Sequence, residues 1–463
     1  MPVSPRRVVV VGGGISGLAA AHALRQADPA PEVTVLEASA EIGGKLRRAE
    51  VGGVTVDVGA EAMLNRRPEA TGLARDAGLA EDLVHPATTT AQLWNRNRLV
   101  PMPRTVMGVP TDLSALDPVI SRKGIARAAL DAVLPATDLD GRDMSIGDLV
   151  EERFGKEVVD RLVEPLLGGV YAGHAREISA RAATPQVVAL LDRDRSLARA
   201  AAAVIAGPAS EVPVFAGIRG GVGRLPGAVA EASGATVRVQ ATVRDVVRRP
   251  DGGWRLVIGS TRDPELVEAD AVVLAAPARP TARLLSDVAS DAALELARIE
   301  YASMAVITLA FAARDLPQLP GSGFLVPPVD GHTIKAATFS FAKWDWVREA
   351  GDGLLLLRCS IGRHREEQVL QVPDEELVDA AVRDLTDAIG LSVRPVDSHV
   401  QRWGGALPQY AVGHVDRVAS VRRALQSVGG LAVCGAAYDG LGIPACIASA
   451  RLAATKVLAD LSR

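Results

Sequence analysis

Residues 8–17 read VVVVGGGISG and decide the fold of the N-terminal region. The four valines predict a short buried strand, the glycines predict a tight turn, and residues 15–26 have the apolar spacing of a helix. A second buried strand is expected at Val33–Leu36. A strand, a crossover helix and a parallel strand within about 30 residues form a right-handed βαβ unit, which opens a doubly wound sheet.

The spacing Gly12-x-Gly14-x-x-Gly17 falls between the expected strand and helix, and Glu37 follows Gly17 by 20 residues. Glycine lets backbone N–H groups approach a pyrophosphate, and the positive end of the helix favours the phosphate charge. A carboxylate after the second strand can accept hydrogen bonds from ribose hydroxyls. In this context the pattern predicts a bound dinucleotide; the alternative is a glycine-rich turn that binds none.

The composition of the 463-residue chain, 48% hydrophobic and 23% charged, is typical of a globular protein with a substantial core. A net charge of -4 gives no basic surface for nucleic acid, so no such partner is expected. Three cysteines, Cys359, Cys434 and Cys446, fit neither a disulfide framework nor a zinc site. We therefore expect no metal site and a reducing, cytoplasmic location.

Arg6-Arg7 followed by valines superficially resembles a secretion signal, but glycines and Ser16 interrupt the apolar run. No apolar stretch reaches the ~20 residues that span a bilayer. Integral membrane insertion is not expected, whereas a peripheral membrane contact stays open.

The sequence predicts an α/β fold, α+β overall, with three units. Residues 111–164 are helical without clear strands, residues 237–247 and 254–257 form a hairpin, and residues 301–311 and 354–360 are strands of a second sheet. Further elements expected are a strand at 270–276, a strand at 430–435 and a helix at 444–461. The predicted division is a discontinuous dinucleotide-binding domain (1–68, 218–285 and 396–463), a substrate-binding domain with a mixed sheet (69–92, 178–217 and 286–395) and a helical insertion (93–177).

The choice of FAD depends on a resemblance. Gly43-Gly44-Lys45 follows Glu37, and Asp57–Glu61 follows a third strand, as in the glutathione-reductase-like FAD proteins of the amine oxidase superfamily, which the chain resembles. The resemblance implies that Lys45 lies near phosphate or ribose, Gly59–Ala62 near the flavin, and the backbone of Val243 at the adenine. The residues implied to contact FAD are Gly12, Gly13, Gly14, Ile15, Ser16, Gly17, Glu37, Ala38, Gly44, Lys45, Gly59, Ala60, Glu61, Ala62, Val243, Trp403, Gly435, Ala436, Leu441, Gly442 and Ile443.

A narrower resemblance covers essentially the whole chain. Residues 164–173 read EPLLGGVYAG and residues 101–110 read PMPRTVMGVP, two stretches similar to signatures of the FAD-dependent porphyrinogen oxidases. Residues 220–226 (GGVGRLP), 406–410 (ALPQY) and 438–447 (YDGLGIPACI) extend the likeness. Ala445 and His174 depart from it, because the family often has Asn or Asp at these positions.

This resemblance implies oxidation of coproporphyrinogen III to coproporphyrin III in heme biosynthesis, with dioxygen as acceptor and hydrogen peroxide as product. Protoporphyrinogen IX is the alternative substrate. More distant alternatives are an amine oxidase or carotenoid desaturase on the same fold, and a flavin- or tetrapyrrole-binding protein without activity. A transient contact with a ferrochelatase follows from the order of the pathway alone.

The substrate carries propionates, so positive charge should recognise it. Arg66 and Arg67, just after the expected flavin-facing segment, are the candidates, against the alternative of surface solvation. Tyr171 and Gly173 are candidates to shape the pocket, or simply to pack. Lys343 is a further candidate for the substrate pocket; its Lys-Trp context resembles the porphyrinogen oxidases more than the lysine of amine oxidases. No proton acceptor is named.

Overall fold

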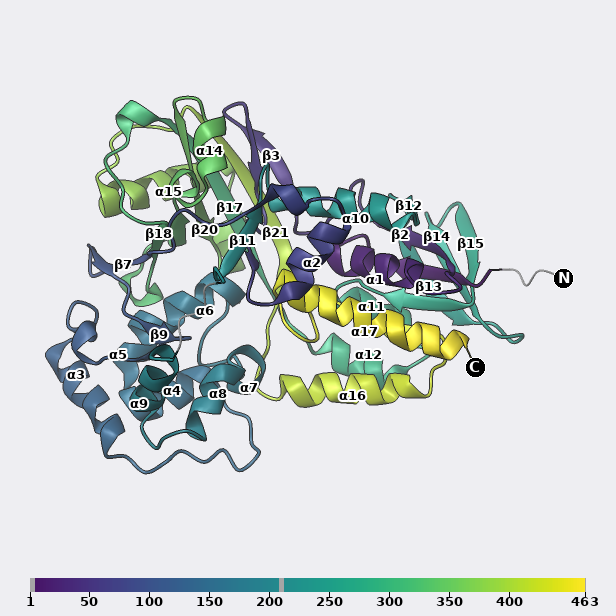
Figure 1. Cartoon of the computed structure of the whole chain (residues 1–463), viewed down its shortest axis with the longest axis horizontal. Helices are drawn as coiled ribbons and strands as arrows, with labels where there is room; N and C mark the ends of the chain where they lie inside the picture. The colour runs from purple at the N-terminus through teal and green to yellow at the C-terminus, as the bar shows by residue number, and fades with distance from the viewer. Residues whose placement is uncertain (1–4, 208–211, 463) are drawn as a thin grey trace.

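The computed structural model describes residues 5–207 and 212–462. The nucleotide-binding part is a five-stranded parallel sheet in the order β12-β2-β1-β16-β22 (Figure 1). The central strands β1 and β16 are buried apolar runs, as expected where helices or a second sheet cover both faces, whereas the edge strand β12 is partly exposed. Their bounds are β1 Arg7–Val11, β2 Glu32–Leu36, β12 Thr236–Arg238, β16 Ala271–Leu274 and β22 Leu431–Val433. The Rossmann-type fold predicted from residues 8–17 is confirmed.

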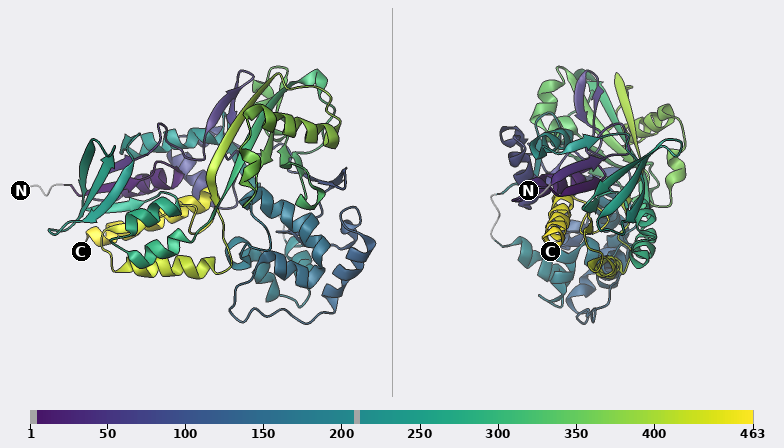
Figure 2. Two further views of the ribbon diagram at one scale, coloured as in Figure 1. Left: turned by 180° about the vertical axis from the view of Figure 1, so that it is seen from behind. Right: turned by 90° about the vertical axis from the view of Figure 1, so that its right-hand side faces the viewer.

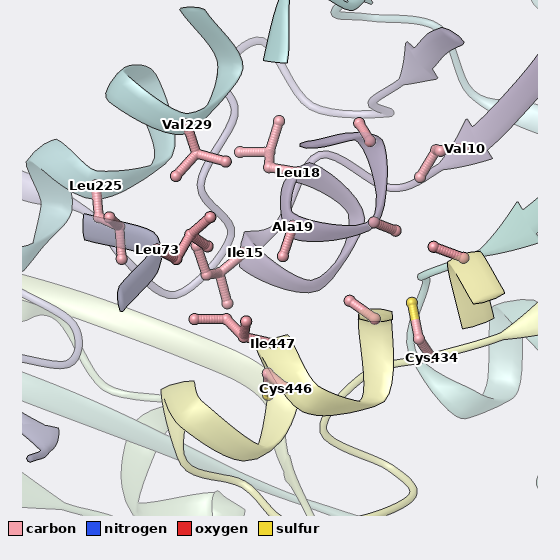
Figure 3. Packing of buried hydrophobic residues seen from close by; sticks show 14 of the residues in the cluster. Val10, Ile15, Leu18, Ala19, Leu73, Leu225, Val229, Cys434, Cys446 and Ile447 are labelled. Carbon is pink, nitrogen blue, oxygen red and sulfur yellow. The ribbon is translucent and has the colours of Figure 1, made fainter. Parts of the chain in front are cut away.

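One face of this sheet is covered by helices from distant parts of the chain: α1 Ile15–Arg25, α2 Pro68–Asp76, α10 Leu225–Ser233 and α17 Ile443–Leu461. Helix α1 lies at the centre, and its buried alanines allow α17, itself rich in alanine, to pack closely against it. In Figure 3, Ile15 and Ala19 of α1 face side chains of the other helices. Those labelled there are Leu73, Leu225, Val229, Cys446 and Ile447.

The other face carries a three-stranded antiparallel sheet and three helices. Trp254 is fully buried here and packs in one cluster with Val9 and Val11 of β1. The strands are β13 Val243–Arg248, β14 Trp254–Gly259 and β15 Pro264–Ala269, and the helices are α11 Ala278–Leu285, α12 Ser290–Ala297 and α16 His414–Gln426.

The predicted hairpin is correct for β13 and β14, which pair antiparallel around residues 249–253. Its first part is wrong. Val237 lies in β12, which pairs in parallel with Val35 of β2 at the edge of the nucleotide-binding sheet. The chain leaves that sheet at Gln240, which has a positive φ of 54°, and enters the next one at Val243. A continuous run of strand-forming residues thus spans two sheets.

The second large sheet has seven strands in the order β21-β17-β20-β19-β18-β7-β8. Helix α15 (Asp374–Ile389) covers one face, while α14 (Asp345–Ala350) and the hairpin β3–β4 (Arg48–Val51, Val54–Asp57) pack on the other. The strands expected at 301–311 and 354–360 are β17 Tyr301–Ala312 and β20 Leu354–Ile361, as predicted. The others are β7 Gln92–Asn95, β8 Arg98–Pro101, β18 Gly323–Leu325, β19 Ile334–Thr338 and β21 Asp397–Pro408.

The third unit is helical and lies below the seven-stranded sheet in Figure 1; Figure 2 shows it from two more sides. The expectation of helices without strands in residues 111–164 is confirmed. No helix in the described ranges is long and apolar enough to cross a membrane. The helices are α3 Arg122–Ala129, α4 Ile146–Phe154, α5 Lys156–Val158, α6 Glu164–Tyr171, α7 Ala180–Ala183, α8 Pro185–Leu191 and α9 Leu197–Ile205.

The units interleave more than the predicted boundaries allow. Strand β8 lies in residues assigned to the helical insertion, and β21 in residues assigned to the FAD-binding domain, yet both belong to the seven-stranded sheet. Helices α8 and α9, assigned to the substrate-binding domain, pack in the helical core. The strand and helix contacts thus cross the predicted boundaries, and the division into three functional domains stays a prediction.

A buried ion pair ties the helical unit together. Arg153 Nε on α4 donates to Asp131 Oδ1 at 2.7 Å, and the side chains are 2% and 1% exposed. Asp131 also accepts from Ser196 Oγ (2.6 Å) at the start of α9. Because nearly every polar atom of the pair has a partner, the pair joins α4 and α9 without an unpaired charge.

We predict that Asp131→Ala lowers the free energy of unfolding by about 3–5 kcal/mol, because it leaves Arg153 buried and unpaired. The control Asp379→Ala removes an exposed ion pair with Arg394. It should change the free energy of unfolding by no more than about 1 kcal/mol. Urea unfolding followed by far-UV circular dichroism measures both. Equal effects of the two substitutions would contradict the structural role of Asp131.

Candidate functional site

The glycines of the first turn differ in structural role: two allow close packing, and one leaves the backbone accessible. A Cβ on Gly17 would lie 1.8 Å from the carbonyl oxygen of Gly12, and Gly12 itself has a φ of +110° and lies against Ala275. These two positions allow strand, turn and helix to close. A Cβ on Gly14, in contrast, would meet no described atom within 4 Å. Gly14 therefore leaves backbone open at the N-terminus of α1.

Glu37 is held beside this turn. Its Oε2 accepts from the backbone N–H of Gly13 at 2.6 Å, and its Oε1 accepts from the N–H and hydroxyl of Ser39, both at 2.8 Å. The carboxylate thus lies at the end of β2, next to the glycine turn. This is where the sequence places the ribose-binding acid.

The second glycine pair folds onto the first turn. The N–H of Gly43 donates to Gly13 O at 2.8 Å, and a Cβ on Gly44 would lie 3.5 Å from the Cα of Gly14. Lys45 donates from Nζ to Ala406 O at 2.7 Å, and partial desolvation by the surrounding chain lowers the pKa of its ammonium group. Turns separated by 30 residues therefore form one continuous backbone surface.

The segment after Asp57 joins the same surface. A Cβ on Gly59 would lie 1.9 Å from Lys45 O, so only glycine fits there. Trp403 donates from Nε1 to Val58 O at 3.1 Å. Farther along, the N–H of Ala241 donates to Glu37 O at 2.8 Å, which brings the approach to Val243 beside the end of β2.

Two long helices present open N-termini to this region. Helix α1 is preceded by Gly14 and α17 by Gly442, and neither has a side-chain cap or an acidic residue in its first turn. Ile15 and Ile443 belong to the same hydrophobic cluster. Uncapped N–H groups and the positive end of a helix suit an anion, so the residues present fit a pyrophosphate and an electron-rich flavin.

A buried cluster of charges holds the Gly59–Ala62 segment. Lys343 Nζ donates to Glu61 Oε1 at 2.6 Å, Arg358 Nη1 donates to Glu61 Oε2 at 3.0 Å, and Arg358 Nη2 donates to Gly59 O at 2.6 Å. Burial alone would raise the pKa of Glu61, but Lys343 and Arg358 hold it at about 2. The ammonium of Lys343 is thus engaged by Glu61.

Arg358 was not predicted from the sequence, although a signal was present. It is the one charged residue in the buried strand β20, whose residues read LLLLRCSI. A cation inside an apolar run usually has a buried partner. Here the partners are Glu61 and the Gly59 carbonyl oxygen.

The candidates for the substrate pocket fall into two groups. Tyr171 and Gly173 meet Gln409: its Nε2 donates to Tyr171 O at 2.8 Å, and a Cβ on Gly173 would lie 2.1 Å from its Oε1. Burial raises the pKa of Tyr171 to about 12. Arg67 pairs instead with Glu69 at 2.5 Å, and Arg66 is exposed before α2.

Comparison with known proteins agrees with this arrangement. The model of the family described as flavin containing amine oxidoreductase matches residues 15–458. The chain belongs to this family. It is an FAD-dependent oxidoreductase on the amine oxidase fold.

Several curated relatives are similar over their whole length. Coproporphyrinogen III oxidase of Mycobacterium tuberculosis (strain H37Rv) is 38% identical over 99% of both chains, and that of Bacillus subtilis 30% identical over 98% of both. The chloroplastic protoporphyrinogen oxidase of Oryza sativa is 29% identical over 97% of this chain and 87% of the relative. A crystal structure from Exiguobacterium sp. 255-15, provisionally named a protoporphyrinogen oxidase, superposes with a TM-score of 0.87, 30% identity and full coverage of both chains.

We predict that Gly14→Ala and Gly17→Ala affect the protein differently. Gly14→Ala should leave the stability of the FAD-free protein unchanged and weaken FAD binding about tenfold or more, because the methyl group enters the space that the dinucleotide needs. Gly17→Ala should destabilise the FAD-free protein itself. Thermal unfolding and flavin fluorescence titration separate the two effects. Wild-type FAD affinity in Gly14→Ala would contradict the placement of the cofactor.

We also predict an acid-dependent contribution from Glu61. Its folded pKa of about 2 lies below the unfolded value, so its stabilisation is full above about pH 4.3 and is lost as the pH falls toward 2. The free energy of unfolding of the wild type should exceed that of Glu61→Gln by up to about 3 kcal/mol near neutral pH, and the difference should shrink on acidification. Urea unfolding at several pH values measures it. A difference independent of pH would refute the assignment.

Proposed function

We propose that this protein oxidises coproporphyrinogen III to coproporphyrin III in heme biosynthesis. The observation that carries the proposal is the likeness over the whole chain, at up to 38% identity, to relatives named coproporphyrinogen III oxidase. The plant protoporphyrinogen oxidase is 29% identical, against 38% for the mycobacterial coproporphyrinogen III oxidases, so protoporphyrinogen IX is the less favoured substrate.

The reaction removes six electrons from the substrate. When bound, FAD supplies a two-electron acceptor that dioxygen reoxidises. One substrate molecule therefore requires three turnovers, three molecules of dioxygen and the release of three molecules of hydrogen peroxide.

The contribution of this chain is binding and orientation. The glycine turns and Glu37 would hold the dinucleotide, and the positive end of α17 would favour negative charge on the flavin. Lys343 is a positioning residue in this proposal, because it holds Glu61 and thereby the Gly59–Ala62 segment. Tyr171, with its raised pKa, keeps its proton at neutral pH and is no general base. The tautomerism of the macrocycle can release the remaining protons.

The remaining assignments are part of the same proposal. The residues named in the sequence analysis would contact FAD, Arg66 and Arg67 would meet propionates at the mouth of the pocket, and Tyr171 and Gly173 would shape it. We place the enzyme in the cytoplasm, with dioxygen as co-substrate and a ferrochelatase as the recipient of the product.

Anaerobic mixing with coproporphyrinogen III tests the proposal. The visible absorbance of oxidised flavin should bleach, and admission of air should restore it and produce porphyrin fluorescence. A flavin spectrum that stays oxidised would favour a binding protein without activity. Faster bleaching by protoporphyrinogen IX would reverse the choice of substrate, and bleaching by an amine alone would favour an amine oxidase.

A further inference from the structure

Two cations are buried next to helix α6. Lys335 on β19 is 2% exposed, and Arg363, just after β20, is 6% exposed. Within residues 5–207 and 212–462, neither forms an ion pair, and Lys335 Nζ and Arg363 Nη1 have no hydrogen-bond partner. Arg363 Nη2 makes one long contact, 3.5 Å to Val326 O.

Such a pair opposes folding. Burying an ammonium or guanidinium without a partner loses hydration with nothing in return, and two like charges also repel each other. Burial lowers the pKa of Lys335 to about 7, and the charge of Arg363 contributes. Buried polar groups without partners are rare in native proteins, and functional sites are a common reason for them.

The acidic residues nearby do not neutralise the pair. Glu164 on α6 accepts from the N–H of Ala175 at 3.0 Å through Oε1, which also lies 3.9 Å from Arg176 Nη1, and burial raises its pKa. Glu366 is 54% exposed and lies 3.9 Å from His174. Both are close enough to interact with Arg363 electrostatically, yet neither is within 4 Å of its nitrogens.

The position of the pair connects it with the substrate stretch. A Cβ on Gly168 would lie 2.6 Å from Arg363 Nη1, so a side chain at residue 168 would displace the guanidinium from its present position. The next two residues of α6, Gly169 and Val170, are exposed. The N–H of His364, adjacent to Arg363, donates to Ala172 O at 2.7 Å. Arg363 therefore lies against the Gly-Gly-Val-Tyr-Ala-Gly stretch, and Lys335 is close enough to Arg363 to interact with it electrostatically.

We propose that Lys335 and Arg363 form a carboxylate-binding pair that receives one propionate of the tetrapyrrole substrate. The planar fork of a guanidinium suits a carboxylate, and an ammonium adds charge. The inference rests on the proposed function for the identity of the ligand. It adds a site deep between α6 and the seven-stranded sheet to the exposed Arg66 and Arg67.

Binding of coproporphyrin III, measured by quenching of its fluorescence in the FAD-loaded protein, tests the pair directly. Arg363→Met should raise Kd about 10- to 100-fold, since hydrogen bonds to charged groups have that effect. Arg363→Lys should restore part of the affinity. The matched control is Arg365→Met, which removes an exposed arginine two positions away that pairs with Glu177 and Glu300, and should leave Kd unchanged.

Lys335→Met separates a ligand site from a structural role. Removal of an unpaired buried charge should raise the midpoint of thermal unfolding of the ligand-free protein while it weakens coproporphyrin III binding. A lower midpoint, or an unchanged Kd in both Lys335→Met and Arg363→Met, would overturn the inference. The tetramethyl ester of coproporphyrin III offers no carboxylate, so these variants should bind it as wild type does; a loss of ester affinity equal to the loss for the free acid would also overturn it.

The two proposals fail in different ways. If coproporphyrinogen III does not bleach the flavin of the wild-type protein, the proposed function fails. If it bleaches the wild-type flavin and the variants bind the free acid normally, only the carboxylate pair fails.

Discussion

The close approach of backbone to backbone at the first turn is the constraint on which the rest of the structure depends. Gly17 lies so near the Gly12 carbonyl that no side chain fits, and Gly12 lies against the chain after β16. This packing lets α1 begin directly above the sheet. Every later segment of the cofactor site, from Gly43 to the start of α17, is placed relative to that turn.

The site is built mainly from backbone. Gly43, Gly44 and Gly59 remove side chains where turns meet, while Glu37 and Lys45 bind backbone groups. Charged side chains enter at the other end, where Glu61, Lys343 and Arg358 join the seven-stranded sheet to the Gly59–Ala62 segment. The nucleotide-binding half and the seven-stranded sheet are thus connected by a largely buried ion-pair cluster, which is stable only because its charges are paired.

The sequence predicted well what depends on local pattern. The valine run, the glycine spacing and the alanine-rich helix gave β1, α1 and α17 nearly to the residue. It failed at Val237, because the pairing partner of a strand depends on tertiary structure and not on propensity. Arg358, Lys335, Arg363 and Gln409 were missed because their importance comes from contacts with residues far away in the chain. Hydrophobic periodicity carries no information on such contacts. A single cation in an apolar strand, however, indicates that a buried partner is to be expected.

The discontinuity of the nucleotide-binding part affects how the protein can fold during its synthesis. Strand β22 and helix α17 complete the sheet and its covering layer, and α17 ends at Leu461 of a 463-residue chain. At roughly 5–20 residues per second, a ribosome needs on the order of tens of seconds between the first glycine turn and this helix. During that interval α2 and α10 can pack against α1, but the part of α1 that contacts α17 stays uncovered. The candidate FAD site, which includes the start of α17, is therefore incomplete until this helix has been synthesised.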